Sequence, residues 1–90
     1  MKSRSKKSRN AFENFGGYLK AQRLKLGYNQ DFVSEELGIT AMFVSNIELD
    51  KCKIPLKHLR VLIKVYGLNK KEVIDQYLSF ERKRLERDLK

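Results

Sequence analysis

The stretch that decides the fold runs from residue 29 to residue 48 and reads NQDFVSEELGITAMFVSNIE. Val33 and Leu37 lie four positions apart, and a second apolar pair further on lies three apart; both spacings are typical of one buried helix face. Gly38 can adopt the left-handed conformation that turns a chain sharply, and Thr40 can then cap a new helix. The stretch therefore predicts two short helices, over residues 30–37 and 41–49, joined by a tight turn.

The region before this stretch divides into a tail and a helix. Residues 1–10 contain five basic residues, three serines and no acidic residue, so we expect a flexible basic arm. Asn10 followed by Glu13 resembles a capping box, which predicts a helix over residues 11–26. Gly27 then suits the left-handed position that ends a helix.

Two more helices are predicted after the stretch. Pro55 suits the first turn of a helix whose apolar residues recur at helical spacing. Asn69 caps a final helix that can continue through Leu89. No strand pattern and no internal repeat appears in the sequence. The prediction is an all-α fold, with a compact five-helix bundle over residues 11–76 and a helical extension over residues 77–90.

The chain carries a large excess of positive charge. Its 90 residues include 20 Lys and Arg against 11 Asp and Glu, which gives a formal net charge of +9. Such an excess attracts polyanions, so nucleic acid is the first expected partner and a membrane surface the second. No apolar run approaches the ~20 residues that span a bilayer. Cys52 and His58 each stand alone, so we expect no internal disulfide and no zinc site in a cytoplasmic protein.

Together these features resemble the lambda-repressor/Cro-type helix-turn-helix domain, over residues 15–74. The likeness rests on the spacing of residues in four segments: Phe15-Gly16 and Leu19 in the first helix, Gln30 and Ser34 in the second, Leu37 to Thr40 at the turn with Val44 and Ile47 after it, and Leu56, Leu59, Ile63, Gly67 and Val73 towards the end. The resemblance implies a bundle of five short helices whose third helix enters the DNA major groove. It also implies a partly buried ion pair between Arg23 and Glu48, which would join the first helix to the end of the third.

Three features depart from the pattern of that family. Asp50 stands where the family usually has glycine, but aspartate tolerates the left-handed conformation well, so the turn is expected to persist. The proline that usually precedes the fourth helix lies one position later, at Pro55. The third helix begins with Ala41, Met42 and Phe43 in place of polar residues, which puts hydrogen-bonded base reading there in doubt. Phe43 is left open between core packing and DNA contact.

The resemblance places the DNA-contacting residues on and beside the third helix. Base reading is expected from its outward positions, which are Ala41, Met42, Ser45 and Asn46. Phosphate contacts are expected from the start of the second helix and from the flank of the third, at Asn29, Gln30, Thr40, Lys51, Lys53 and Lys57. The basic arm is expected to attract phosphates without specificity, with insertion into a minor groove as the lesser alternative.

The last helix extends beyond the usual end of such a domain. Its apolar residues lie near one stripe: Ile74, Tyr77, Leu78, Leu85 and Leu89. Family domains usually bind DNA as dimers, so the stripe is expected to form a homodimer, as an antiparallel pair or a short coiled coil. The alternative is that Ile74 and Tyr77 only cover the core and the end of the helix frays.

We therefore expect a sequence-specific transcription regulator that binds double-stranded DNA in the nucleoid, as a repressor that occupies an inverted-repeat operator as a homodimer. The rival is a protein-interaction module of the antitoxin or phage-adaptor type, because an exposed apolar pair at Met42 and Phe43 suits a protein partner. RNA binding is favoured only by the basic arm. No cofactor, metal or enzymatic activity is expected, since the chain has one His, one Cys and no phosphate-binding glycine loop.

Overall fold

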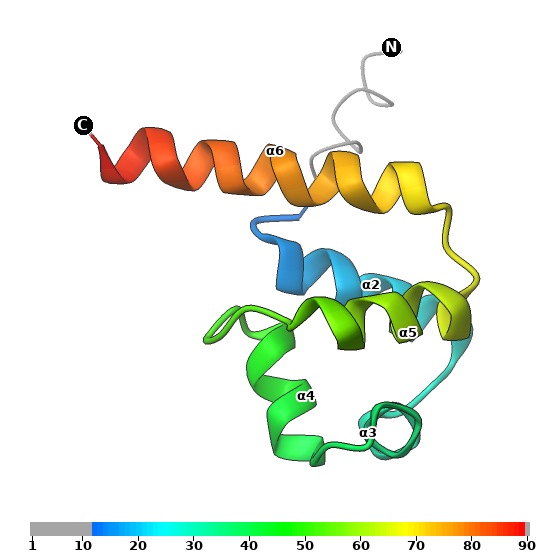
Figure 1. The fold of residues 1–90 in the computed structure, drawn as a ribbon. Helices are drawn as coiled ribbons and strands as arrows, with labels where there is room; N and C mark the ends of the chain where they lie inside the picture. The colour runs from blue at the N-terminus through cyan, green and yellow to red at the C-terminus, as the bar shows by residue number, and fades with distance from the viewer. Residues whose placement is uncertain (1–11, 90) are drawn as a thin grey trace, which may run out of the picture.

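The computed structural model describes residues 12–89, and within this range it contains helices and no strand. Five helices follow one another along the described chain (Figure 1): α2 (Phe15–Leu26), α3 (Gln30–Leu37), α4 (Ala41–Glu48), α5 (Leu56–Tyr66) and α6 (Lys70–Asp88). The predicted all-α fold is confirmed, including the long C-terminal helix. The predicted basic arm, residues 1–10, lies outside the described residues.

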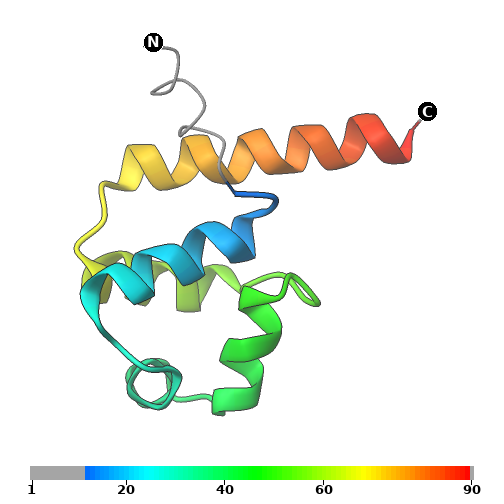
Figure 2. The ribbon, with the colours of Figure 1, turned by 180° about the vertical axis from the view of Figure 1, so that it is seen from behind.

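The five helices are arranged around α2. Helix α2 contacts α4, α5 and α6, and α3 packs against α4 and α5. Figures 1 and 2 show α6 along one side of the bundle and α3 with α4 on the other side. The second half of α6 extends past the other helices (Figure 2). The helix pair over residues 30–48 and the projecting end of α6 are therefore held on a common frame.

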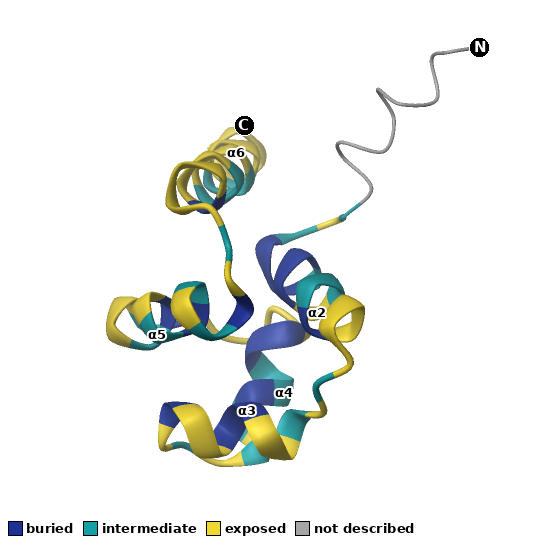
Figure 3. Cartoon of the chain, turned by 90° about the vertical axis from the view of Figure 1, so that its right-hand side faces the viewer, coloured by how far each residue is buried: buried dark blue, intermediate teal, exposed yellow. Residues whose placement is uncertain are grey.

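Each helix contributes at least one side chain to a single hydrophobic core. The buried apolar residues are Phe15, Tyr18, Leu19, Val33, Leu37, Val44, Ile47, Ile54, Leu59, Leu62, Tyr66 and Val73. Figure 3 shows these faces turned inward while the outer faces of the helices stay exposed. The spacing of three and four residues in the sequence therefore identifies the inner faces of α3 and α4, because burial of apolar surface stabilises the folded chain.

Helix α2 begins later than the sequence predicts. Its first residue is Phe15, and the Asn14 side chain accepts a hydrogen bond from the backbone N–H of Gly17 at 2.8 Å. The prediction of helix at Glu13 is wrong, and the start predicted at Ala11 lies outside the described residues. The helix starts after Asn14 because the Asn14 side chain satisfies a free backbone N–H group at the helix end.

The turn after α4 depends on Asp50. Its φ of 61° is the one positive value at a residue other than glycine in the described chain. The N–H of Asp50 donates to the carbonyl of Ile47 at 3.0 Å, and the N–H of Lys51 donates to the carbonyl of Asn46 at 2.9 Å. This is the hydrogen-bond pattern of a Schellman cap. The left-handed turn expected at Asp50 is present, and α4 ends at Glu48, one residue earlier than predicted.

Leu56 is one of the apolar residues on which the family resemblance rests, but it is not buried in the core. It is the first residue of α5, directly after Pro55, and it is 73% exposed. Ile63 is another of these apolar residues, and it is only partly buried. The helical spacing places both residues correctly on one face of α5, but α6 does not cover that face at its edge.

Candidate nucleic-acid interface

The turn between α3 and α4 is closed by backbone hydrogen bonds. Gly38 has a φ of 70°, and its N–H donates to the carbonyl of Glu35 at 3.3 Å. The N–H of Ile39 donates to the carbonyl of Ser34 at 3.0 Å. Ser34 is buried where the two helices approach, and its hydroxyl donates to the Asp31 carbonyl. A small side chain is needed there because the helices cross closely, so the angle between α3 and α4 is fixed.

Both helices of this pair begin with a side-chain cap at the predicted residue. Asn29 Oδ1 accepts a hydrogen bond from the N–H of Phe32 at 2.8 Å, and Thr40 Oγ1 accepts one from the N–H of Phe43 at 3.0 Å. Asn29 and Thr40 are exposed. In each cap the side-chain oxygen accepts a hydrogen bond. The amide N–H groups of Asn29 and the hydroxyl hydrogen of Thr40 therefore remain free to donate to an anion.

Helix α2 crosses the end of α4 at Gly16. A Cβ atom on Gly16 would lie 2.8 Å from the carbonyl oxygen of Glu48 and would overlap the carbonyl oxygen of Ile47. No side chain fits between these two backbones. A glycine that looks unfavourable for helix formation in the sequence is therefore what allows α2 and α4 to approach each other.

A buried ion pair joins the same two helices. Arg23 Nε donates to Glu48 Oε2 at 2.6 Å, and Arg23 Nη2 donates to Glu48 Oε1 at 2.9 Å. The two side chains are 7% and 4% exposed. Arg23 Nη1 also donates to the carbonyl of Tyr28 at 2.9 Å. The hydrogen bond to Glu48 raises the pKa of the Arg23 guanidinium, and the contact between the two side chains is bidentate.

Gln30 belongs to this ion-pair network, which the sequence did not indicate. Gln30 Nε2 donates to Glu48 Oε1 at 3.0 Å from the first residue of α3. Glu48 thereby connects α4 to both α2 and α3. One of the two N–H groups of the Gln30 side-chain amide is therefore used inside the protein, which the predicted phosphate contact did not anticipate.

Tyr66 lies beside the network with its hydroxyl group buried. No residue in the described range hydrogen-bonds to that oxygen. Burial, followed by the negative charge of Glu48, raises the pKa of the Tyr66 phenol well above its usual range. The ring packs in the core and stays neutral, but a buried hydroxyl without a partner lowers stability.

A family model described as helix-turn-helix matches residues 19–73, which is more than half of the chain. The chain belongs to this family. The match extends from Leu19 in α2 to Val73 in α6 and includes the whole of the α3–α4 pair. The resemblance to lambda-repressor/Cro-type domains is confirmed, and such helix-turn-helix domains are DNA-binding regulators of transcription. No curated protein and no solved structure gave a significant match to the chain.

In this helix-turn-helix domain α4 is the recognition helix, and its outward face is small and mixed in character. Met42 is 72% exposed, while Ala41, Ser45 and Asn46 are partly exposed. Phe43 packs against the core, and its ring meets His58 edge-on with the centroids 6.2 Å apart. The question left open for Phe43 is therefore answered in favour of packing, and the exposed apolar pair is reduced to Met42.

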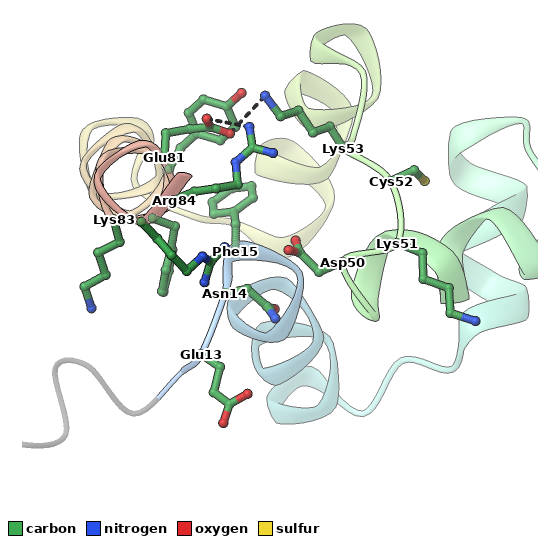
Figure 4. A pocket seen from close by; sticks show the side chains of 13 residues that line it. Glu13, Asn14, Phe15, Asp50, Lys51, Cys52, Lys53, Glu81, Lys83 and Arg84 are labelled. Atoms are coloured by element: carbon green, nitrogen blue, oxygen red, sulfur yellow. Dashed lines mark hydrogen bonds and ion pairs between the residues drawn. The ribbon is translucent and has the colours of Figure 1, made fainter. Parts of the chain in front are cut away.

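The lysines beside the recognition helix point in different directions. Lys51 and Lys57 are exposed. Lys53 Nζ instead contacts Glu81 Oε2 on α6 at 3.0 Å, and Arg84 also contacts Glu81, at 2.9 Å. Figure 4 shows Lys53 directed towards Glu81 and Lys51 directed away from it. These contacts, with Lys53 first, lower the pKa of Glu81. Lys53 therefore links the loop after α4 to α6.

Among residues 12–89, none of the helices combines the length and the hydrophobicity of a membrane span. The same residues contain no group of three or more His, Cys, Asp or Glu side chains placed to hold a metal ion.

Proposed function

We propose that this chain is a sequence-specific regulator of transcription that binds double-stranded DNA, and that it represses by occupying an inverted-repeat operator as a homodimer in the cytoplasm. The observation that carries the proposal is the rigid α3–α4 pair. Its capped helix starts face solvent, and its far end is fixed to α2 by Gly16 and by the Arg23–Glu48 pair. The net charge of +9 favours a polyanionic partner.

The roles of the DNA-contacting residues divide by position. Base reading falls to the outward residues of α4, which are Ala41, Met42, Ser45 and Asn46. Phosphate binding falls to the residues around the two helix starts and after α4, which are Asn29, Gln30, Thr40, Lys51, Lys53 and Lys57. Asn46 is the one amide on the reading face and can pair with an adenine edge, whereas Met42 suits a thymine methyl group. Lys53 must leave Glu81 before it can reach a phosphate.

The homodimer would form through α6. Ile74, Leu78, Leu85 and Leu89 are exposed on this helix, and such a row of apolar residues is unusual at a surface that binds nothing. Tyr77 does not belong to this exposed row, because its ring packs edge-on against Phe15 with the ring centroids 5.2 Å apart. We propose that residues 11–76 form the DNA-binding domain and residues 77–90 the dimerisation segment.

Met42 supports a second candidate function. A side chain that is 72% exposed and apolar, at the centre of the reading face, also suits a protein partner. The alternative is an interaction module of the antitoxin or phage-adaptor type that keeps this fold and binds protein through α4.

Selection of bound fragments from genomic DNA tests the proposal. The purified chain is incubated with sheared DNA, and the retained fragments are sequenced. We expect enrichment of a short inverted repeat whose half-sites lie about one helical turn apart, roughly 34 Å. A variant with Met42→Glu serves as the control, because it changes only the exposed reading face. Fragments retained without any common sequence, by the chain and the control alike, would contradict sequence-specific binding.

A further inference from the structure

Helix α6 carries an exposed apolar stripe that the rest of the described chain does not cover. The stripe consists of Ile74, Leu78, Leu85 and Leu89. The residues that face the bundle are Val73, Tyr77 and Phe80. At 3.6 residues per turn the stripe lies about a third of a turn from that face. The stripe is therefore separate from the contact that holds α6 on the core, and it can bind another surface.

The spacing of the stripe is symmetric about its centre. The four residues follow one another at intervals of four, seven and four positions, and the midpoint falls between Glu81 and Arg82. Two α6 helices aligned antiparallel about this midpoint bring Ile74 of one copy opposite Leu89 of the other. The same alignment brings Leu78 opposite Leu85. The stripe is thus complementary to itself, as the interface of a two-fold symmetric dimer must be.

An apolar groove between α5 and α6 adjoins the stripe. Leu56, Leu59 and Ile63 line it from α5, and Val73 and Ile74 line it from α6. Leu56 is 73% exposed at its edge. In the antiparallel alignment the far end of the second copy's α6 lies beside Ile74 and enters this groove. The groove of each copy then receives the helix end that projects from the other.

The rim of the groove is basic, and the helix end that would enter it carries charges of both signs. Three basic residues form the rim: Arg60, Lys64 and Lys70. Two acidic residues flank the apolar pair at the far end of α6: Glu86 and Asp88. The last carbonyl groups of α6 add the negative end of the helix dipole. Both carboxylates already contact arginines of α6, Glu86 with Arg82 at 3.2 Å and Asp88 with Arg87 at 3.7 Å. The negative end of the helix dipole is therefore the part of this helix end that suits the basic rim.

The antiparallel alignment also leaves both recognition helices on the same side. Figure 3 looks along α6, with the bundle to one side of it. Because the stripe lies on the flank of α6, the two-fold axis of an antiparallel pair runs from α6 towards the bundle, and both bundles stay on that side. In a parallel pair the two-fold axis runs parallel to α6. The second bundle then lies on the opposite side of the helix pair. Only the antiparallel pair lets both copies contact one face of a duplex.

We infer that the stripe and the groove form one self-complementary surface through which two copies pair with antiparallel α6 helices. This inference rests on the homodimer in the proposed function. It adds the direction of the helices, and it adds Leu56, Leu59 and Ile63 of α5 as the surface that receives the distal apolar residues, Leu85 and Leu89, of the second copy.

Disulfide cross-linking tests the direction of the helices in the full chain. In a Cys52→Ser background, Leu78→Cys and Leu85→Cys chains are prepared separately, one with a mass tag, then mixed and oxidised. A disulfide requires Cα atoms within roughly 7 Å, so the antiparallel pair predicts a mixed product and little self-linked product. Self-linking of Leu78→Cys that equals or exceeds the mixed product would overturn the antiparallel order. No cross-link, with a monomer in sedimentation, would overturn the pairing itself.

A pair of charge substitutions tests the groove. Leu56→Glu places a carboxylate at the edge of the groove, and Leu24→Glu places one on α2, where the leucine is also exposed. Neither change buries a charge in the monomer. We expect Leu56→Glu to weaken dimer association by about tenfold or more, and Leu24→Glu to leave it unchanged. Wild-type association of Leu56→Glu in sedimentation would remove the groove from the interface.

The two proposals fail in different ways. If the chain cross-links as predicted but retains no common DNA sequence, sequence-specific DNA binding is wrong and the α6 pairing stands. If the chain binds a selected site as a monomer, the α6 pairing and the homodimer are wrong, while sequence-specific binding stands.

Discussion

At the scale of single residues, Gly16 allows α2 and α4 to approach each other closely. Because a Cβ atom there would overlap two backbone carbonyl groups, Gly16→Ala should lower the free energy of unfolding by about 1–3 kcal/mol. Gly17→Ala is the matched control, since its Cβ atom would meet only the Asn14 side chain, at 3.3 Å. Urea unfolding measures both. Equal losses from the two variants would show that helix propensity, not the crossing, explains the glycines.

The Arg23–Glu48 pair should be strongly coupled. Removal of either partner leaves a buried charge, so Arg23→Ala and Glu48→Ala should each cost roughly 3 kcal/mol of stability. The double variant should cost less than the sum of the single variants. A double-mutant cycle in denaturant measures the difference. Strictly additive losses would mean that the two side chains do not stabilise each other.

Tyr66 should stabilise the fold through its ring and not through its hydroxyl. Its folded-state pKa is raised above the unfolded value of about 10, so its contribution to stability is present below pH 10 and is lost as the pH rises further. Tyr66→Phe removes a buried hydroxyl that has no partner in the described chain, so it should leave stability at pH 7 unchanged or raise it by up to about 1–3 kcal/mol, and it should reduce the loss above pH 10. Thermal melts between pH 7 and pH 11 measure this. A large loss at pH 7 would reveal a hydrogen bond to the hydroxyl.

At the scale of helices, local sequence predicts most of what the structure shows. Asn29, Thr40 and Asn69 cap helices at their predicted positions because capping depends on neighbouring residues alone. The features that the sequence did not indicate join distant segments. Gln30 reaches Glu48 across 18 positions, and Lys53 reaches Glu81 on α6. No local pattern encodes such contacts. The sequence therefore predicted phosphate contacts for both side chains, whereas in the structure each side chain already contacts a glutamate.

The recognition helix and the loop after it should contribute differently to DNA binding. Asn46→Ala should relax the preference at one base position, by roughly 1–3 kcal/mol, because it removes a base contact. Lys51→Ala should weaken binding to all duplexes similarly and reduce the salt slope by about one. Affinity measurements on the selected site and its single-base variants separate the two effects. If both substitutions weakened all sequences to the same degree, the division between reading and phosphate contact would be wrong.

At the scale of the whole molecule, the two surfaces to which we assign function lie on opposite sides of the bundle. The α3–α4 pair lies on one side and the projecting part of α6 on the other, with α2 between them (Figure 1). Composition and spacing predicted the class of fold and the position of the α3–α4 pair. They did not predict that Leu56 would remain exposed beside α6, because burial at the edge of a bundle depends on where the next helix crosses.

If this molecule reads the sequence of duplex DNA, a titration against two different duplexes will distinguish them. The full chain is titrated against a selected duplex and a scrambled duplex of equal length, at several salt concentrations. We predict that the selected duplex binds at least about 10³-fold more tightly and that log K falls steeply with log salt for both. Equal affinity for the two duplexes, or a flat dependence on salt, would contradict the account.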